Sequence, residues 1–429
     1  MRKANIVMPD RTANNLATDS DLAKIDAGLP QRLHALDAVR GLAAAIVLNH
    51  HCLTIIPAYS DYFYSDWTTE ARSVTEYILF YTPARIFWSG YEAVTLFYVL
   101  SGLVLALPWI EGHPPQYRAF LVKRISRIYL PYVAIIAIAA VAVYFLQPIF
   151  HISGGSNWIN TETWSAPVTI ENLVQHALML GQTNFRLNGA VHSLVWEMRV
   201  SLLFPLLMIP MISWKWRASL ILIMGCFLIV AAIHVLLRSV SENSLTGTIL
   251  WELQHTAYYT IFFVIGASMA LNLDRIRRFF ETTSKYHAGE FVMCAGLLMV
   301  QTHWSQTHAF HNIGVATGSV FVISAALAPG RIERFLLAPP LQFLGRISYS
   351  VYLVQVPILA AVTFFLQNVL PLWSMIIIVY PLVLTSGWAF HVLIAEPCAR
   401  LGKRITRLQQ QNPQRPISIK QIASSRVQS

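Results

Sequence analysis

Long apolar stretches separated by short polar segments recur along the whole chain. A helix needs about 20 mostly apolar residues to cross a hydrocarbon core of about 30 Å, and ten segments approach or reach that length. They are 41–57, 89–108, 128–147, 191–211, 218–237, 250–272, 289–302, 312–328, 347–367 and 374–394. The pattern predicts an all-α membrane protein, a bundle of about ten transmembrane helices, in which the seventh and eighth segments are short or interrupted.

Composition supports this interpretation. Apolar residues make up 55% of the chain and charged residues only 12%, and the mean hydropathy is +0.51. These values exclude an ordinary soluble domain and a disordered chain. The first expected partner is therefore the lipid bilayer.

The distribution of Lys and Arg predicts the orientation. If the N-terminus lies inside, 26 of the 31 Lys and Arg residues fall in inner segments. The positive-inside rule then places both termini in the cytoplasm, and an even number of spans is needed to keep the alternation. Anionic lipid heads and the membrane potential explain the net charge of +10. No nucleic-acid partner is expected.

The polar ends divide the chain into three parts. Residues 1–31 are expected to be a flexible cytoplasmic tail without a cleaved signal peptide, 32–405 the transmembrane domain, and 406–429 a basic, disordered cytoplasmic tail. The four cysteines are isolated, which argues against a disulfide or zinc framework. His303, His308 and His311 lie near one another without an acidic or Cys partner, so no metal site is expected.

Arg40 and His51 bracket the first apolar segment and lie eleven positions apart. On a helix this spacing brings the two side chains within about 20° of the same face, about 16 Å apart along the axis. Ionisable residues are costly inside a membrane and are by default candidates for function. This stripe alone is compatible with a proton path, a binding cavity or catalysis.

Several segments resemble the successive motifs of the acyltransferase 3 family of membrane O-acyltransferases. They are LDAVRG (36–41) followed by His51, GYEAVTLFYVLSG (90–102), KRISRIYLPY (123–132), HSLVWEMRVSLLFP (192–205), LGRISYSVYLVQVP (344–357) and Glu396-Pro397. Each motif alone is weak, but their order and the matching topology make the resemblance specific. It covers about residues 32–405.

The resemblance implies transfer of an acyl group, often acetyl from acetyl-CoA, to a hydroxyl of a carbohydrate or related acceptor. The setting that it implies is the bacterial inner membrane. The family's Arg-x10-His motif falls on Arg40 and His51, whereas His50 is out of register and projects about 100° away from His51 on a helix.

His51 is the candidate general base. A thioester is already activated, so the enzyme has chiefly to remove the proton of the acceptor hydroxyl and stabilise the developing oxyanion. A neutral histidine in a low-dielectric interior suits the first task. The alternative is a histidine whose polar atoms are satisfied by a neighbouring helix or that lines a passive cavity.

Glu197 is the second catalytic candidate, because its depth in the fourth apolar segment lies within about one helical turn of that of His51. It could orient His51, bind a sugar hydroxyl or pair with Arg199, although positions i and i+2 do not face each other. In the family an aromatic residue, usually Trp, precedes this Glu by five positions. His192 stands there and is a candidate substrate-lining residue.

Arg124 and Arg127 form an Arg-x-x-Arg step at the inner edge, where both guanidinium groups can reach phosphates. The resemblance assigns this step to the acyl-CoA donor, with Lys123 extending it. Arg40 lies near the same edge and is expected to bind the donor or to pair with Asp37. The alternative for the basic step is an anchor on lipid head groups.

Ser101 precedes Gly102 in the second apolar segment and is expected to line the acyl path or to support close packing. Tyr349 and Tyr352 are candidate substrate-lining residues of the ninth segment. Family members commonly carry a His where Gln355 stands, so an acid–base role is lost at that position.

The outer loop, about 148–190, is rich in Gly, Ser, Asn and Trp. Exposed Trp, Asn and Gln there would suit a carbohydrate, although Trp also marks membrane interfaces, and a short surface helix is expected near 170–180. Two alternatives stay open for the whole chain. One is a non-enzymatic glycan transporter that couples to protons through buried His and Glu; the other is an acyltransferase for longer or branched acyl chains.

Overall fold

The computed structural model describes residues 31–65, 70–146, 149–165, 167–180, 187–241, 244–283, 286–301 and 308–411. Within these ranges the secondary structure is helical and contains no strand. The helix α18 (Glu396–Gln411) continues beyond residue 405, so the first residues of the expected C-terminal tail are helical. The remainder of that tail and the first 30 residues lie outside the described ranges.

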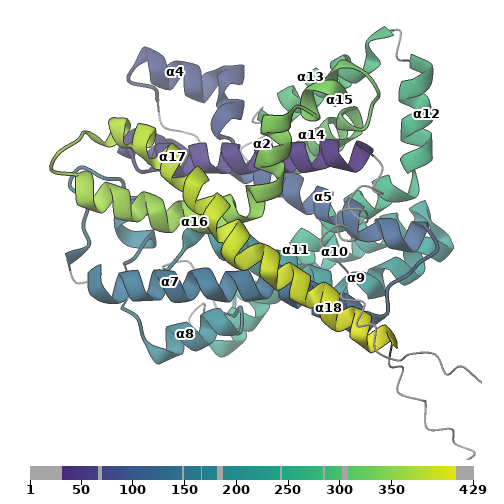
Figure 1. Ribbon diagram of the computed structural model, residues 1–429, viewed down its shortest axis with the longest axis horizontal. Coiled ribbons are helices and arrows are strands. Elements are labelled where there is room, and N and C mark those ends of the chain that lie inside the picture. The colour runs from purple at the N-terminus through teal and green to yellow at the C-terminus, as the bar shows by residue number, and fades with distance from the viewer. Residues whose placement is uncertain are drawn as a thin grey trace, which may run out of the picture.

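Six helical stretches are long and apolar enough to cross a membrane. They are α5 (Gly90–Ile110), α6–η2–α7 (Tyr117–Leu146), η5–α9 (Gly189–Trp214), α10 (Trp216–Leu237), α16 (Pro339–Leu366) and α17–η7–α18 (Leu372–Leu408). In Figure 1 the last of these runs as one long diagonal from α17 into α18.

Two further candidate spans are bent. The helix α2 (Gln31–Thr54) meets α3 (Pro57–Tyr64) at 112°, and α11 (Leu245–Leu271) meets α12 (Leu273–Thr283) at 62°. By length and composition, the described residues thus contain six candidate spans, or eight if each bent pair counts as one. The segments expected at 289–302 and 312–328 form the shorter apolar helices α13 (Ala288–Gln301) and α14 (His308–Ala326). All ten apolar segments are therefore helical, but a count of ten crossings is not confirmed.

Glycines bring the central helices into backbone contact. A Cβ at Gly41 of α2 would lie 2.6 Å from the backbone nitrogen of Gly345 in α16. A Cβ at Gly102 of α5 would lie 2.1 Å from the carbonyl oxygen of Phe263 in α11. Small residues permit such approaches between membrane helices. Three of the motif glycines, Gly41, Gly102 and Gly345, therefore set the distances between the helices that carry the site.

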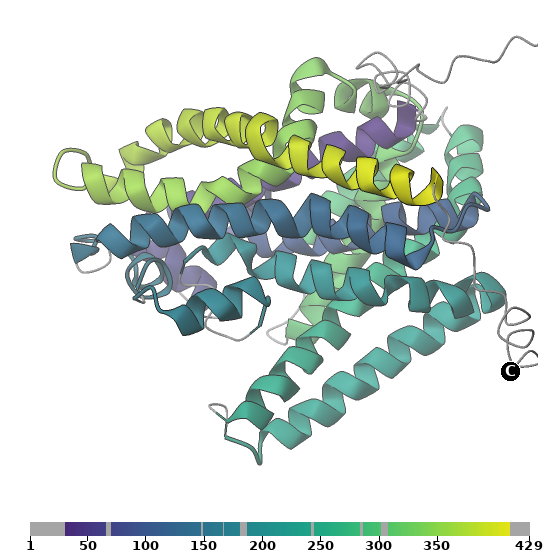
Figure 2. The ribbon, with the colours of Figure 1, turned by 60° about the horizontal axis from the view of Figure 1, so that its bottom comes forward.

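The end of the α10–α11 hairpin where the two helices are connected diverges from the rest of the bundle, as Figure 2 shows. Only 6% of the apolar window of α10 is buried inside the protein. Most of the surface of α10 carries large, exposed apolar side chains, including those of Ile221 and Leu228. Such a surface is expected of a helix that faces lipid on most sides.

The outer loop folds back onto the bundle. It contains η4 (Trp158–Glu162) and the short helix α8 (Ile170–Ala177), which lies where a surface helix was expected. The hydroxyl of Tyr132 in α7 donates to the carbonyl oxygen of His176 and lies 3.2 Å from its Nδ1. Burial lowers the pKa of His176 to about 4, so this imidazole is neutral at physiological pH.

The expectation of exposed Trp in this loop is wrong. The side chains of Trp158 and Trp164 are 7% and 1% exposed. Trp164 donates to the carbonyl oxygen of Leu187, and Trp158 packs into the bundle. The apolar area of an indole ring is large, so burial of these two rings against the bundle is more favourable in free energy than their exposure to water.

The remaining described helices are short and lie at the two ends of the bundle. They are α4 (Val74–Tyr81), η1 (Pro83–Trp88) and α15 (Arg331–Leu336). Of these, η1 matters for the site because it packs against α2 and leads into α5.

Candidate active site

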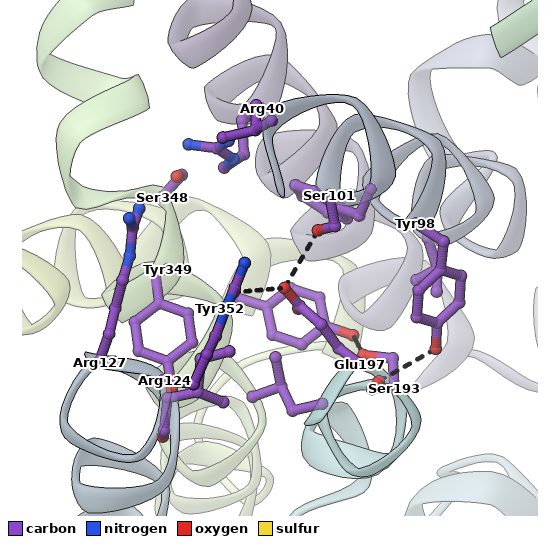
Figure 3. A pocket seen from close by; sticks show the side chains of 15 residues that line it. Arg40, Tyr98, Ser101, Arg124, Arg127, Ser193, Glu197, Ser348, Tyr349 and Tyr352 are labelled. Atoms are coloured by element: carbon purple, nitrogen blue, oxygen red, sulfur yellow. Dashed lines mark hydrogen bonds and ion pairs between the residues drawn. The ribbon is translucent and has the colours of Figure 1, made fainter. Parts of the chain in front are cut away.

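A cavity with three arginines opens between α2, α5, α6, α9 and α16 (Figure 3). We call it the cationic cavity. Its polar and charged lining side chains are Arg40, Tyr98, Ser101, Arg124, Arg127, Ser193, Glu197, Ser348, Tyr349 and Tyr352. Six residues expected to bind donor or substrate, and one of the two catalytic candidates, therefore lie around one space.

Glu197 is the single carboxylate in the lining of the cationic cavity as described. Its Oε1 accepts a hydrogen bond from Ser101 Oγ at 3.0 Å and lies 3.9 Å from Nη1 of Arg124. A pairing of Glu197 with Arg199 does not occur. Arg199 instead pairs with Glu252 of α11 and lies over the ring of Trp196. Positions two apart on a helix point in different directions, which explains the separate partners.

The three guanidinium groups come from different elements. Arg124 ends α6, Arg127 lies in η2 (Ile125–Tyr129), a π-helical turn, and Arg40 lies in α2. Arg40 Nη1 also forms an ion pair of 2.7 Å with Asp37. Arg40 is therefore paired with Asp37 and also lines the cavity, and its binding of the donor stays a prediction.

Lys123 is exposed and is not among the residues that line the cationic cavity. It is the immediate neighbour of Arg124, and adjacent positions on a helix point about 100° apart. Its expected contact with the donor finds no support in this geometry.

A second cavity holds three histidines and is called the histidine cavity. Its polar and aromatic lining side chains are His50, His51, Phe63, Tyr91, Thr95, Tyr98, His192, Ser193, Tyr259 and Tyr352. His50, which projects about 100° away from His51 on an ideal helix, also lines this cavity, and the two ring centres lie 5.5 Å apart. The cavity therefore extends across two adjacent positions of α2.

His51 and His50 have different surroundings. The ring of His51 stacks on Trp158 at 5.4 Å with an interplanar angle of 8°. Its Nδ1 is buried without a hydrogen-bond partner in the described structure, and the side-chain amide of Gln355 lies next to the ring. His50 Nδ1 lies 3.2 Å from the carbonyl oxygen of Trp88 and is held in place. Of these two neighbouring imidazoles, His50 thus has its Nδ1 next to a backbone carbonyl oxygen, whereas the Nδ1 of His51 has no hydrogen-bond partner among the described residues.

The two cavities meet at a shared wall of four residues, Val94, Tyr98, Ser193 and Tyr352. Glu197 lies on one side of this wall and His51 on the other. Within the described ranges no hydrogen bond or ion pair joins them. Similar depth in the membrane does not place two side chains in the same space.

A family model described as an acyltransferase domain matches residues 33–392. The chain belongs to the acyltransferase 3 family. No curated protein and no solved structure matches it.

Members of the acyltransferase 3 family transfer acyl groups to hydroxyls. Membership confirms the prediction of an enzyme over that of a transporter, and the apolar helices make this one a multi-pass membrane acyltransferase. The match ends at residue 392, somewhat before the C-terminal boundary expected for the domain.

A buried charged cluster near the histidine cavity was missed in the sequence. Nη2 of Arg85 in η1 lies 2.5 Å from Oε1 of Glu92 in α5, and Nε2 of His311 in α14 lies 3.5 Å from the same oxygen. Arg85 also donates to the carbonyl oxygen of Gln301. The three side chains are at most 5% exposed. One signal was available, since Glu92 is the carboxylate of the acyltransferase 3 motif at 90–102.

Among the residues that the structure describes, no group of three His, Cys, Asp or Glu side chains could hold a metal ion. His303 and the side chain of His308 lie outside the described residues. His311 instead belongs to the cluster with Glu92.

Proposed function

We propose that this acyltransferase takes an acyl group from an acyl-CoA, acetyl-CoA in the simplest case, and transfers it to a hydroxyl of a carbohydrate acceptor. A cell-envelope or exported polysaccharide in a bacterial inner membrane is the acceptor class. The observation that carries the proposal is the cationic cavity, which directs Arg40, Arg124 and Arg127 into one space beside the histidine cavity.

The cationic cavity suits the donor. Coenzyme A carries a pyrophosphate and a 3′-phosphate, and guanidinium groups bind phosphate oxygens in a bidentate fashion. Three cations face a single carboxylate in the described lining, so the cavity keeps a positive balance for an anion. The acyl end of the donor would then point toward the shared wall and His51.

His51 is proposed to act as the general base. It would take the proton of the acceptor hydroxyl while that oxygen attacks the thioester carbonyl carbon. The carbon–sulfur bond then breaks, and the CoA thiolate leaves and regains a proton. Stacking on Trp158 fixes the plane of the imidazole, and Gln355 beside it can bond a ring nitrogen. In the alternative mechanism, the acyl group is first transferred from CoA to a side chain of the enzyme and then from that side chain to the acceptor hydroxyl.

The proposed topology has ten crossings and cytoplasmic termini. It treats the two bent pairs as single spans and the shorter helices α13 and α14 as crossings that rely on their neighbours. The cationic cavity then faces the cytoplasm, where acyl-CoA is made. The support for this orientation is the distribution of Lys and Arg between inner and outer segments.

The direct test of the function uses the cell envelope as the acceptor. Mass spectrometry of envelope glycans from cells with and without the gene should show one acetyl mark that disappears on deletion. Membranes that carry the protein should release free CoA from acetyl-CoA, and deletion membranes should release less. If the glycans and CoA release are the same in both strains, the proposal is wrong.

Replacement of Arg124 by alanine should weaken donor binding. A hydrogen bond to a charged group contributes about 1.5–3 kcal/mol, so the apparent KM for acyl-CoA should rise by about 10–100-fold. The measurement is CoA release against acyl-CoA concentration. Lys123→Ala is the matched control, since this exposed neighbour does not line the cavity. Equal effects of the two variants would indicate a general role of charge at the membrane surface instead.

A further inference from the structure

The wall between the two cavities is held by two tyrosines and one serine. The hydroxyl of Tyr352 in α16 lies 2.6 Å from Oγ of Ser193 in α9. The hydroxyl of Tyr98 in α5 donates to the carbonyl oxygen of the same serine at 3.0 Å. Three membrane helices are therefore joined at Ser193. We call Tyr98, Ser193 and Tyr352 the tyrosine partition; Figure 3 shows all three beside Glu197.

The tyrosine partition stands where a donor would have to pass. The arginines line only the cationic cavity, and the histidines line only the histidine cavity. The residues that line both cavities are Val94 and the three residues of the tyrosine partition. If phosphates bind to the arginines and the proton is taken by His51, the thioester must lie at this wall.

The aromatic ring of Tyr352 belongs to one of the two large side chains of the wall. It packs edge-to-face against Phe97 at 6.0 Å, and the residue is 7% exposed. A single hydrogen bond between neutral groups fixes its end, and such a bond contributes only about 0.5–1.5 kcal/mol. The hydroxyl can therefore be released with little cost, whereas a large displacement of the ring disturbs its packing.

We propose that Tyr352 determines the acyl specificity of the enzyme by limiting the width of the passage between the two cavities. The donor class is then a short, unbranched acyl-CoA, because a branched acyl group needs the space that the ring occupies. This inference rests on the proposed function and names the substrate class of the same site.

The test compares two isomeric donors of equal carbon number. Native membranes carrying each variant are given acetyl-CoA, butanoyl-CoA or 2-methylpropanoyl-CoA, and release of free CoA is measured with a thiol reagent. Membranes from cells without the gene supply the background. The wild-type enzyme should prefer butanoyl-CoA to its branched isomer. In Tyr352→Ala the rate ratio of branched to straight donor should rise by about tenfold or more, the scale at which pockets discriminate a methylene group.

Three controls separate the width of the passage from other effects. Tyr352→Phe and Ser193→Ala remove the same hydrogen bond but keep the ring, so the isomer ratio should change by less than about threefold. Tyr349→Ala removes a ring of the same helix that lines the cationic cavity only, and it should leave the ratio unchanged. Tyr352→Leu is the second size variant if Tyr352→Ala does not accumulate, and it should shift the ratio in the same direction.

The outcomes are distinct. An unchanged isomer ratio in both size variants, with CoA release retained, overturns the role of Tyr352 and leaves the proposed function intact. A wild-type enzyme that does not discriminate between the isomers overturns it as well. Absence of CoA release from every donor in wild-type membranes contradicts the proposed function itself.

Discussion

Replacement of His51 by alanine is expected to lower acyl transfer by about 10²–10⁴-fold, the usual contribution of a positioned general base. The thioester remains activated in the variant, but no group would take the proton of the attacking hydroxyl. The uncommitted Nδ1 of His51 and its stacking on Trp158 support this expectation. The measurement is the rate of CoA release from acetyl-CoA in native membranes, normalised to the amount of protein.

The control for His51 is its neighbour His50. Both imidazoles border the histidine cavity, but His50 is bound to the carbonyl oxygen of Trp88. His50→Ala should therefore affect stability more than turnover, and the loss of rate should be much smaller than in His51→Ala. The apparent KM for acyl-CoA should be unchanged in both, since the arginines lie across the partition. Normal turnover of His51→Ala at a normal protein level would remove His51 from the mechanism.

The sequence predicted the helices and much of the cationic cavity. Arg40, Arg124 and Glu197 are far apart along the chain, yet each lies in a family motif at the depth that its apolar segment implies. Hydropathy sets depth, and motif order relates the chain to one family. These two signals were sufficient to predict several of the residues that the structure brings around one cavity.

Contacts between helices could not be predicted in the same way. Whether Glu197 meets His51 depends on the rotation of α9 against α2, which a helical projection of one segment does not contain. The burial of Trp158 depends on the outer loop folding back over the bundle. The buried cluster of Arg85 could not be predicted either, because its partners Glu92 and His311 come from two other elements.

Replacement of Glu92 by leucine is expected to destabilise the protein by about 3–5 kcal/mol, the cost of breaking a buried ion pair from one side. Arg85 would remain buried without its carboxylate, and the link between η1, α5 and α14 would be lost. Gly90 and Tyr91, the residues just before Glu92, line the histidine cavity, so the substitution should also distort this cavity. The measurement is the free energy of unfolding in mixed micelles.

The double variant Arg85→Met/Glu92→Leu distinguishes an uncompensated charge from a general packing defect. Apolar replacement of both partners of a buried pair is often neutral, so the double variant should recover most of the stability that Glu92→Leu loses. Arg400→Met is the matched surface control. It removes an exposed pair with Glu396 on α18 and should cost less than about 1 kcal/mol. If the double variant is as unstable as Glu92→Leu, the loss comes from packing around α5, and the charge of Arg85 is not its cause.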